Sequence, residues 1–174
     1  VSGYSSGGSP PGTTNIIDKF PFATDANATD VGDLTQARRE AAGQSSTVSG
    51  YSSGGEAPPH VSTMDKFPFT VDTDATDVGD LSIARRLLPG QSSSTSGYVT
   101  GGFPDPATSI EKFPFAVDTN ASGIGNLNVE RYDHGGCSSS TDGYSFGGTP
   151  TASPPRPDRL DSVEKFPFSV DTNS

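Results

Sequence analysis

The sequence Gly-Tyr-Ser-Ser-Gly-Gly at residues 50–55, followed by Met-Asp-Lys-Phe-Pro-Phe at residues 64–69, decides the fold of this chain. Related versions of both segments occur four times along the sequence. They bring a tyrosine at intervals of 47, 47 and 46 residues, at Tyr4, Tyr51, Tyr98 and Tyr144. A fixed period of this length is typical of stacked or radially arranged repeats. We therefore expect one repeat array over 1–174, with units of about 1–46, 47–93, 94–139 and 140–174, the first and last incomplete.

Each unit has the pattern of short β-strands and shows no helical periodicity. Phe67, Phe69 and Val71 share one face of the second segment, while Met64 lies on the other face. A strand with apolar groups on both faces fits between two neighbouring sheets. Pro68 has no backbone N–H, which predicts that this strand lies at a sheet edge or a bulge. The unit predicts an all-β fold with about four short antiparallel strands per repeat.

These segments resemble a known repeat family. Leu81–Arg85 (Leu-Ser-Ile-Ala-Arg), Gly97–Gly102 (Gly-Tyr-Val-Thr-Gly-Gly) and Ile110–Phe115 follow the order of motifs in a kelch repeat. The chain is also similar to the repetitive kelch-like proteins of marine bacteriophages and bacteria. The resemblance implies that the repeats are blades of a β-propeller. The tryptophan of the family's last strand is replaced here by Val31, Val78 and Ile124, which implies a lighter blade core.

An open array completed by neighbouring chains is the alternative architecture. Kelch propellers close with more blades than this chain supplies. The first unit has no strand before Gly3 and the last has none after Asp171, so we expect open edges at 1–8 and 165–174. Strand addition from another copy at these edges would give a homo-oligomer or a fibre.

Composition and charge exclude several classes of function. The formal net charge of −10 and the scarcity of Lys and Arg disfavour nucleic acid and anionic lipid as partners. No apolar run approaches the roughly 20 residues of a membrane-spanning helix, so membrane insertion is not expected. Cys137 cannot form an internal disulfide, and it occupies the position of Gln44 and Gln91, which predicts a small, nearly buried side chain. We expect His60 and His134 to be solvent-exposed loop residues.

The turn after each phenylalanine-containing strand has the only spacing that suits a metal. Oxygen-bearing side chains recur at alternate positions, as hard cations such as calcium require. The alternative is a turn in which these side chains bond the backbone. Calcium is thus the one cofactor that the sequence suggests, and no other is expected. The candidate ligands are Asp25, Asn27, Thr29, Asp33, Asp72, Asp74, Thr76, Asp80, Asp118, Asn120 and Ser122.

Asn27-Ala-Thr and Asn120-Ala-Ser also fit the acceptor pattern for N-glycosylation. The same asparagines are equally explained by the turn. The two alternatives therefore stay open at Asn27 and Asn120.

The sequence favours a non-enzymatic structural or adhesive repeat protein, located outside a cell or on a virion surface. Repetition without a unique cluster of reactive residues supports this interpretation, and the arginines at 38, 85 and 131 are expected to brace backbone carbonyls. One alternative is a binding module that recognises a glycan or a cell-surface protein through the variable loops after each Gly-Gly. The resemblance also implies an enzyme fragment as a last alternative, because some kelch-type propellers are oxidases or sugar isomerases.

Overall fold

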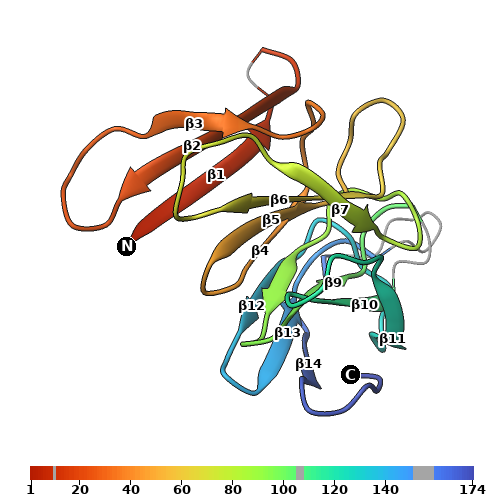
Figure 1. Cartoon of the computed structure of the whole chain (residues 1–174). Helices are drawn as coiled ribbons and strands as arrows, with labels where there is room; N and C mark the ends of the chain where they lie inside the picture. The colour runs from red at the N-terminus through yellow and green to blue at the C-terminus, as the bar shows by residue number, and fades with distance from the viewer. Residues whose placement is uncertain (10, 105–107, 151–158) are drawn as a thin grey trace.

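The structure, a computed structural model, describes residues 1–9, 11–104, 108–150 and 159–174. All regular secondary structure in these residues is β-strand, and the strands form four antiparallel sheets that follow one another along the chain (Figure 1). Sheet 1 contains β1 (Ser2–Gly8), β2 (Thr14–Pro21) and β3 (Thr29–Asp33). Sheet 2 contains β4 (Ala42–Ser45), β5 (Ser49–Ser53), β6 (Thr63–Pro68) and β7 (Thr76–Asp80). The all-β class expected from the sequence is confirmed.

The second half of the chain repeats this pattern. Sheet 3 contains β8 (Gly90–Ser92), β9 (Ser96–Thr100), β10 (Ser109–Pro114) and β11 (Ser122–Asn126). Sheet 4 contains β12 (Gly135–Ser138), β13 (Asp142–Phe146) and β14 (Val163–Pro167). In each sheet the strands are hydrogen-bonded in chain order, so every sheet is a simple meander. None of the sheets closes on itself, and together they make an open array.

The expected strand around Phe67 is present, and of the two positions predicted for it, a sheet edge or a bulge, the sheet edge is wrong. β6 pairs with β5 on one side and with β7 on the other. Pro68 is tolerated because it is the last residue of β6, where one missing N–H does not interrupt the ladder. The irregularity lies at the other end of the strand, between Thr63 and Asp65 in the pairing with β7.

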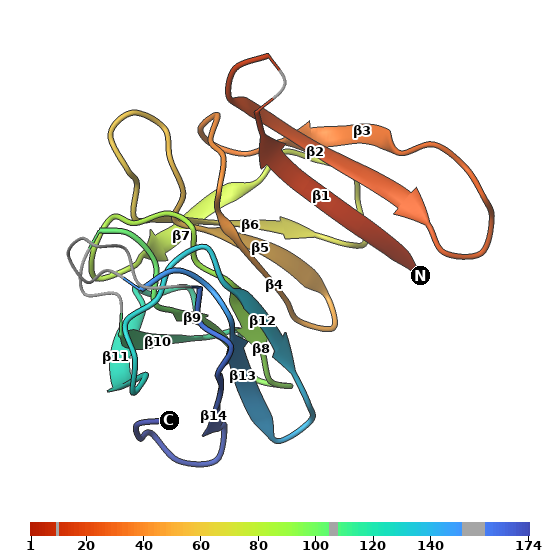
Figure 2. The same ribbon diagram turned by 180° about the vertical axis from the view of Figure 1, so that it is seen from behind.

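The first strands of sheets 2, 3 and 4 lie beside one another. β4 contacts β8, and β8 contacts β12, so these three strands lie side by side when the array is viewed from behind (Figure 2). β1 is equivalent to β5, β9 and β13, because all four carry the Gly-Tyr motif. Sheet 1 therefore has no counterpart of β4 among the described residues, and sheet 4 has no counterpart of β7. β1 and β14 accordingly lie at the edges of three-stranded sheets.

The hydrophobic core lies between successive sheets. One buried cluster joins sheet 1 to sheet 2 around Ile17 and Phe67, and another joins sheet 2 to sheet 3 around Met64 and Phe113. The third cluster joins sheet 3 to sheet 4 and includes Phe166. Val31, Val78 and Ile124 pack at the border of these clusters. A sheet of this protein thus buries its faces only against its neighbours.

Aromatic rings make the same contact at each of these three interfaces. Tyr51 of sheet 2 stacks on Phe115 of sheet 3, with ring centroids 5.0 Å apart. Phe113 lies over Gly97, its partner on β9, where any Cβ would overlap the ring. The glycine of the Gly-Tyr motif therefore leaves room for the phenylalanine. Tyr4 and Tyr98 stack in the same way on the next sheet, at 4.8 and 4.7 Å.

A buried arginine crosses each interface to a carboxylate of the next sheet. Arg38 lies 2.7 Å from Asp65, and neither side chain has any exposed surface. The Arg38 guanidinium also donates to the carbonyls of Ser52 and Thr63, at 3.0 and 3.1 Å. Bracing of backbone carbonyls by these arginines is therefore confirmed, and the carboxylate partner is an addition that the sequence pattern did not reveal. The equivalent pairs are Arg85 with Glu111 and Arg131 with Glu164.

Burial lowers the pKa of the Arg85 guanidinium, and the neighbouring Glu111 carboxylate opposes this shift. Removing the arginine would leave Glu111 buried and without its counter-charge. We expect Arg85→Ala to lower the free energy of unfolding by about 3–5 kcal/mol in urea denaturation. The double variant Arg85→Met/Glu111→Gln should recover part of the loss, because the neutral amide can still accept from the Ser82 N–H, which donates to Glu111 at 2.8 Å. A loss below about 1 kcal/mol for Arg85→Ala would contradict this account.

Candidate functional site

The turns that follow the phenylalanine-containing strands meet the preceding sheet. Asp72 accepts a hydrogen bond from the Lys19 ammonium of sheet 1 at 2.8 Å. The bond to Asp72 raises the pKa of Lys19, and partial burial opposes the shift. The same ion pair recurs at the next two interfaces, as Lys66–Asp118 at 2.8 Å and Lys112–Asp171 at 3.0 Å.

A second side chain of each turn bonds the backbone of the preceding sheet. Asp74 accepts from the N–H of Asp33 at 3.0 Å, and Asn120 accepts from the N–H of Asp80 at 3.1 Å. A return bond runs from the N–H of Ala75 to the Asp33 carbonyl at 2.8 Å. Each turn is therefore attached to the last strand of the sheet before it.

These contacts account for much of the predicted calcium pattern. Asp72, Asp74, Asp118 and Asn120 each contact the preceding sheet, while Asp80 accepts from the Ser62 hydroxyl at 2.8 Å. Over the described residues, no group of three or more His, Cys, Asp or Glu side chains could hold a metal ion. Of the remaining candidates, Asp33 ends β3 and meets Asp74 through its backbone N–H. Thr29, Thr76 and Ser122 begin β3, β7 and β11, and Asp25 and Asn27 are exposed in the first turn. Calcium binding stays a prediction.

The glycosylation hypothesis also stays a prediction. Asn27 and Asn120 are both exposed, as an acceptor for a glycan must be. The Asn120 amide already accepts a hydrogen bond from Asp80, whereas Asn27 lies in the turn of the first sheet.

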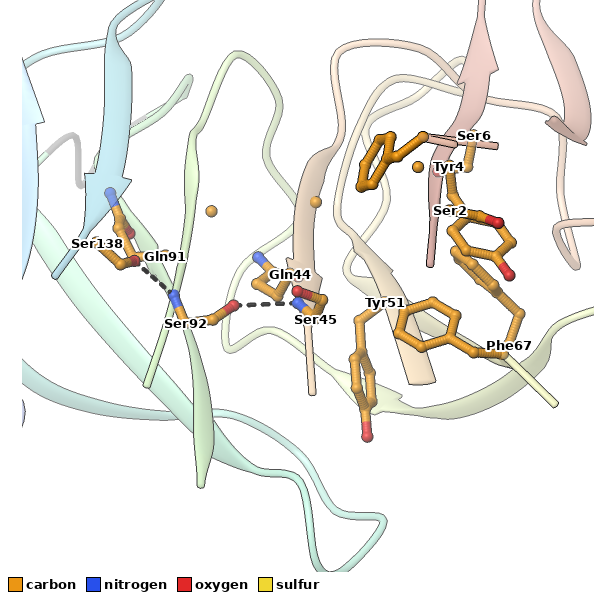
Figure 3. Close-up of a pocket in the computed structure, with 16 residues that line it drawn as sticks. Ser2, Tyr4, Ser6, Gln44, Ser45, Tyr51, Phe67, Gln91, Ser92 and Ser138 are labelled. Carbon is orange, nitrogen blue, oxygen red and sulfur yellow. Dashed lines mark hydrogen bonds between the residues drawn. The ribbon is translucent and has the colours of Figure 1, made fainter. Parts of the chain in front are cut away.

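A pocket of about 580 Å³ lies between β1 and the inner strands of the array (Figure 3). Ser2, Tyr4 and Ser6 line one side, and Gln44 and Ser45 of β4 line the other. All residues of β5 and β9 are buried, whereas β1 is half-exposed along this edge. The pocket therefore occupies the place that a counterpart of β4 would fill in sheet 1.

Polar groups on the far wall of the pocket link successive sheets. The Ser45 N–H donates to the Ser92 hydroxyl at 3.0 Å, and the Ser92 N–H donates to the Ser138 hydroxyl at 2.9 Å (Figure 3). Gln44 donates to the carbonyl of Tyr98 at 3.2 Å, and Gln91 donates to that of Tyr144 at 3.1 Å. Sequence analysis did not identify this pocket, because its lining residues come from strands of all four sheets.

Charged residues gather where the variable loops leave the sheets. Glu56 bridges Arg39 at 2.8 Å and Arg86 at 3.1 Å, and Glu40 bridges Arg86 at 2.5 Å. The hydrogen bond from Arg39 lowers the pKa of the Glu56 carboxyl. Both arginines and both carboxylates are thus paired with each other, and the cluster holds the loops of sheets 2 and 3 together. Further parts of the variable loops, at 10, 105–107 and 151–158, lie outside the described residues.

Two sequence expectations about single residues are wrong. Cys137 is exposed rather than nearly buried, because Gln44 and Gln91 are covered by a following sheet and β12 has none beside it. The histidines are half-buried rather than exposed. His60 packs edge-on against Phe103, with the two ring centroids 5.9 Å apart. His134 places its Nε2 3.4 Å from the Thr100 hydroxyl, between sheets 3 and 4.

Comparison of the sequence with models of known protein families finds no match, and comparison with curated proteins finds none either. The kelch resemblance therefore rests on the motifs of the chain itself. No helix in the described parts of the chain is long and apolar enough to cross a membrane.

The hydrogen bonds of the turns predict how the protein responds to metal removal. Because Asp72, Asp74, Asp118 and Asn120 already accept hydrogen bonds from the preceding sheet, we expect EDTA to leave the melting temperature unchanged. Asn120→Ala should lower the free energy of unfolding by about 1 kcal/mol with or without EDTA, because the Asp80 N–H loses its acceptor. A melting temperature that falls in EDTA and returns with added calcium would establish calcium loops instead.

Burial lowers the pKa of His134 to about 4, and the positive Arg131 adds to this shift while Glu164 opposes it. Between the ordinary pKa of about 6.5 and pH 4, the unfolded chain binds a proton at this residue that the folded chain does not. Stability should therefore fall by up to about 3 kcal/mol as the pH falls through this window. Urea denaturation at pH 7 and pH 4.5 measures this loss, and His134→Gln should reduce it. An equal loss in the variant would contradict the assignment to His134.

Proposed function

We propose that this chain is a non-enzymatic structural or adhesive repeat protein, exposed outside a cell or on the surface of a virion. The observation that carries the proposal is the repetition of one set of contacts at three interfaces. The recurring tyrosines, arginines and turn carboxylates all take part in attaching one sheet to the next. The side chains that recur in every unit thus serve assembly of the array.

The kelch-like propeller is the finer form of the same proposal. Gly54 and Gly55 follow β5 with φ values of 65° and 114°, which suits the Gly-Gly step of the motif. The inner strands β4, β8 and β12 lie side by side, as the inner strands of propeller blades do. A self-assembling fibre completed at 1–8 and 165–174 is part of this proposal, and it requires no cofactor.

A glycan-binding module is the second candidate, and the pocket beside β1 favours it. Tyr4 supplies an aromatic ring, while Ser2 and Ser45 supply hydroxyl groups of the kind that bind sugars. The pocket is lined by the repeated strands rather than by the variable loops. A module of this kind would act through one site beside β1.

Immunogold electron microscopy with antibodies against the chain tests the structural proposal. We expect label on the outside of intact cells or virions of the source. Label confined to the cell interior would overturn the proposed location. A glycan array separates the two candidates, because saturable binding that Tyr4→Ala abolishes would establish the glycan-binding module. The structural role predicts no such binding.

A further inference from the structure

The outward face of sheet 1 differs from the equivalent internal faces by its exposed apolar groups. We call this the N-terminal face and define it by Ile16, Phe20, Phe22 and Asp25. Phe20 is 37% exposed, whereas its equivalents Phe67, Phe113 and Phe166 are 5% exposed or less because a tyrosine of the preceding sheet covers them. Phe22 is 63% exposed and packs edge-on against Phe20. The aromatic pair that lies at every internal interface is therefore present here without its cover.

At Ile16 the N-terminal face differs in chemistry from the equivalent internal faces. The equivalents of Ile16 in the later sheets are Thr63, Ser109 and Ser162. The hydroxyls of Ser109 and Ser162 accept hydrogen bonds from Arg85 and Arg131, whereas Thr63 accepts one from Arg38 through its backbone carbonyl. Ile16 has no side chain that could accept such a bond, and it is 37% exposed. The position that is polar at internal interfaces is thus apolar at this one.

The outward face of sheet 4 shows the corresponding change. We call this the C-terminal face and define it by Tyr144, Phe146, Val163 and Lys165. Phe146 takes the place of Ser53 and Thr100, which bond Gln44 and Gln91 at the internal positions. Val163 is 66% exposed, whereas its equivalents Ile17, Met64 and Ile110 are buried. Cys137 replaces the glutamine on the same face, so a hydroxyl–amide pair has become an apolar pair.

Charge is complementary across the two outward faces. The Lys165 side chain is 59% exposed and lies 4.0 Å from Asp142, whereas Lys19, Lys66 and Lys112 are about half as exposed and bond the next sheet at 2.8–3.0 Å. Asp25 is the equivalent of Asp72, Asp118 and Asp171, which receive those lysines. Lys165 and Asp25 are therefore the positive and negative groups of one such pair, located at opposite ends of the array.

We propose that the C-terminal face of one copy of this chain docks on the N-terminal face of a second copy, head to tail. Tyr144 then covers Phe20 and Phe22 as the internal tyrosines cover their phenylalanines. Lys165 pairs with Asp25, while Phe146 and Val163 pack near Ile16. Such an interface is heterologous, so successive copies form a ring or a filament according to the rotation between them. The proposal deepens the proposed structural function and rests on it, because it names the partner of the assembly as a second copy.

Sedimentation equilibrium of the purified 174-residue chain tests the proposal. We expect an average mass that rises with concentration beyond that of a monomer. Phe22→Ser and Val163→Ser should each weaken association on the order of tenfold, because each removes apolar surface from the interface. Val48→Ser is the matched control, since Val48 is 60% exposed in the turn before β5 and lies on neither face. Circular dichroism of each variant confirms that the monomer remains folded.

Charge reversal at Lys165 and Asp25 tests whether the interface depends on this ion pair, because a purely apolar association would not respond to it. Lys165→Asp and Asp25→Lys should each weaken self-association, because each places like charges opposite one another. An equimolar mixture of the two variants should recover association, since every contact between unlike copies again pairs a lysine with an aspartate. Recovery in the mixture would also establish that the contact is head to tail.

Three outcomes would overturn the interface. The first is that the chain remains a monomer at about 1 mM, a concentration at which an association worth about 4 kcal/mol would be populated. The second is that Val48→Ser weakens association as much as Phe22→Ser does. The third is that the mixture of charge-reversed chains does not recover association. If the chain is found on the cell or virion surface but is monomeric in solution, only the proposed interface is contradicted. If the chain assembles as described but immunogold labels it only inside cells, only the proposed location is contradicted.

Discussion

Stacking of a tyrosine from one sheet on a phenylalanine of the next is the interaction on which the rest of the array depends. With 30% hydrophobic residues and no tryptophan, the chain cannot build a separate core within each sheet. It places its apolar residues between sheets instead, so that Ile17 and Phe67 belong to one cluster although they come from different repeats. The consequence is cooperativity: a single sheet has nothing to bury its faces against, and its stability is shared with its neighbours.

The buried ion pairs add specificity to this packing. Arg38 and Asp65 are both inaccessible to solvent, and burying two charges gains little stability by itself. Their guanidinium and carboxylate groups bond fixed backbone atoms, including the Thr35 N–H, which donates to Asp65 at 2.9 Å. A sheet that slid by one residue would bury these charges without partners. The pairs therefore define how one sheet is placed on the next, while the aromatic contacts supply most of the attraction.

Much of this architecture follows from the sequence, because Gly-Tyr and Lys-Phe-Pro-Phe carry their structural meaning locally. Strand alternation around Phe67 and the turn at Gly54 are decided by neighbouring residues, and both were predictable. The partner of Arg38 was not, because Asp65 lies in the next repeat and no local pattern pairs the two. The exposure of Cys137 escaped prediction for a related reason: its counterparts are buried by a following sheet, which is a property of position in the array. The pocket beside β1 likewise depends on a strand that sheet 1 does not contain.

Repetition of the interface has a consequence for how such a chain can change in length. The side chains that join sheet 1 to sheet 2 are nearly the same as those that join sheet 2 to sheet 3, as the ion pairs Lys19–Asp72 and Lys66–Asp118 illustrate. Sheet order is therefore encoded by covalent connection more than by the identity of the contacting side chains. Duplication or loss of one whole unit in the gene would rejoin compatible surfaces and leave no interface unmatched. Recombination between units can thus alter the reach of the molecule in steps, without the invention of a new contact.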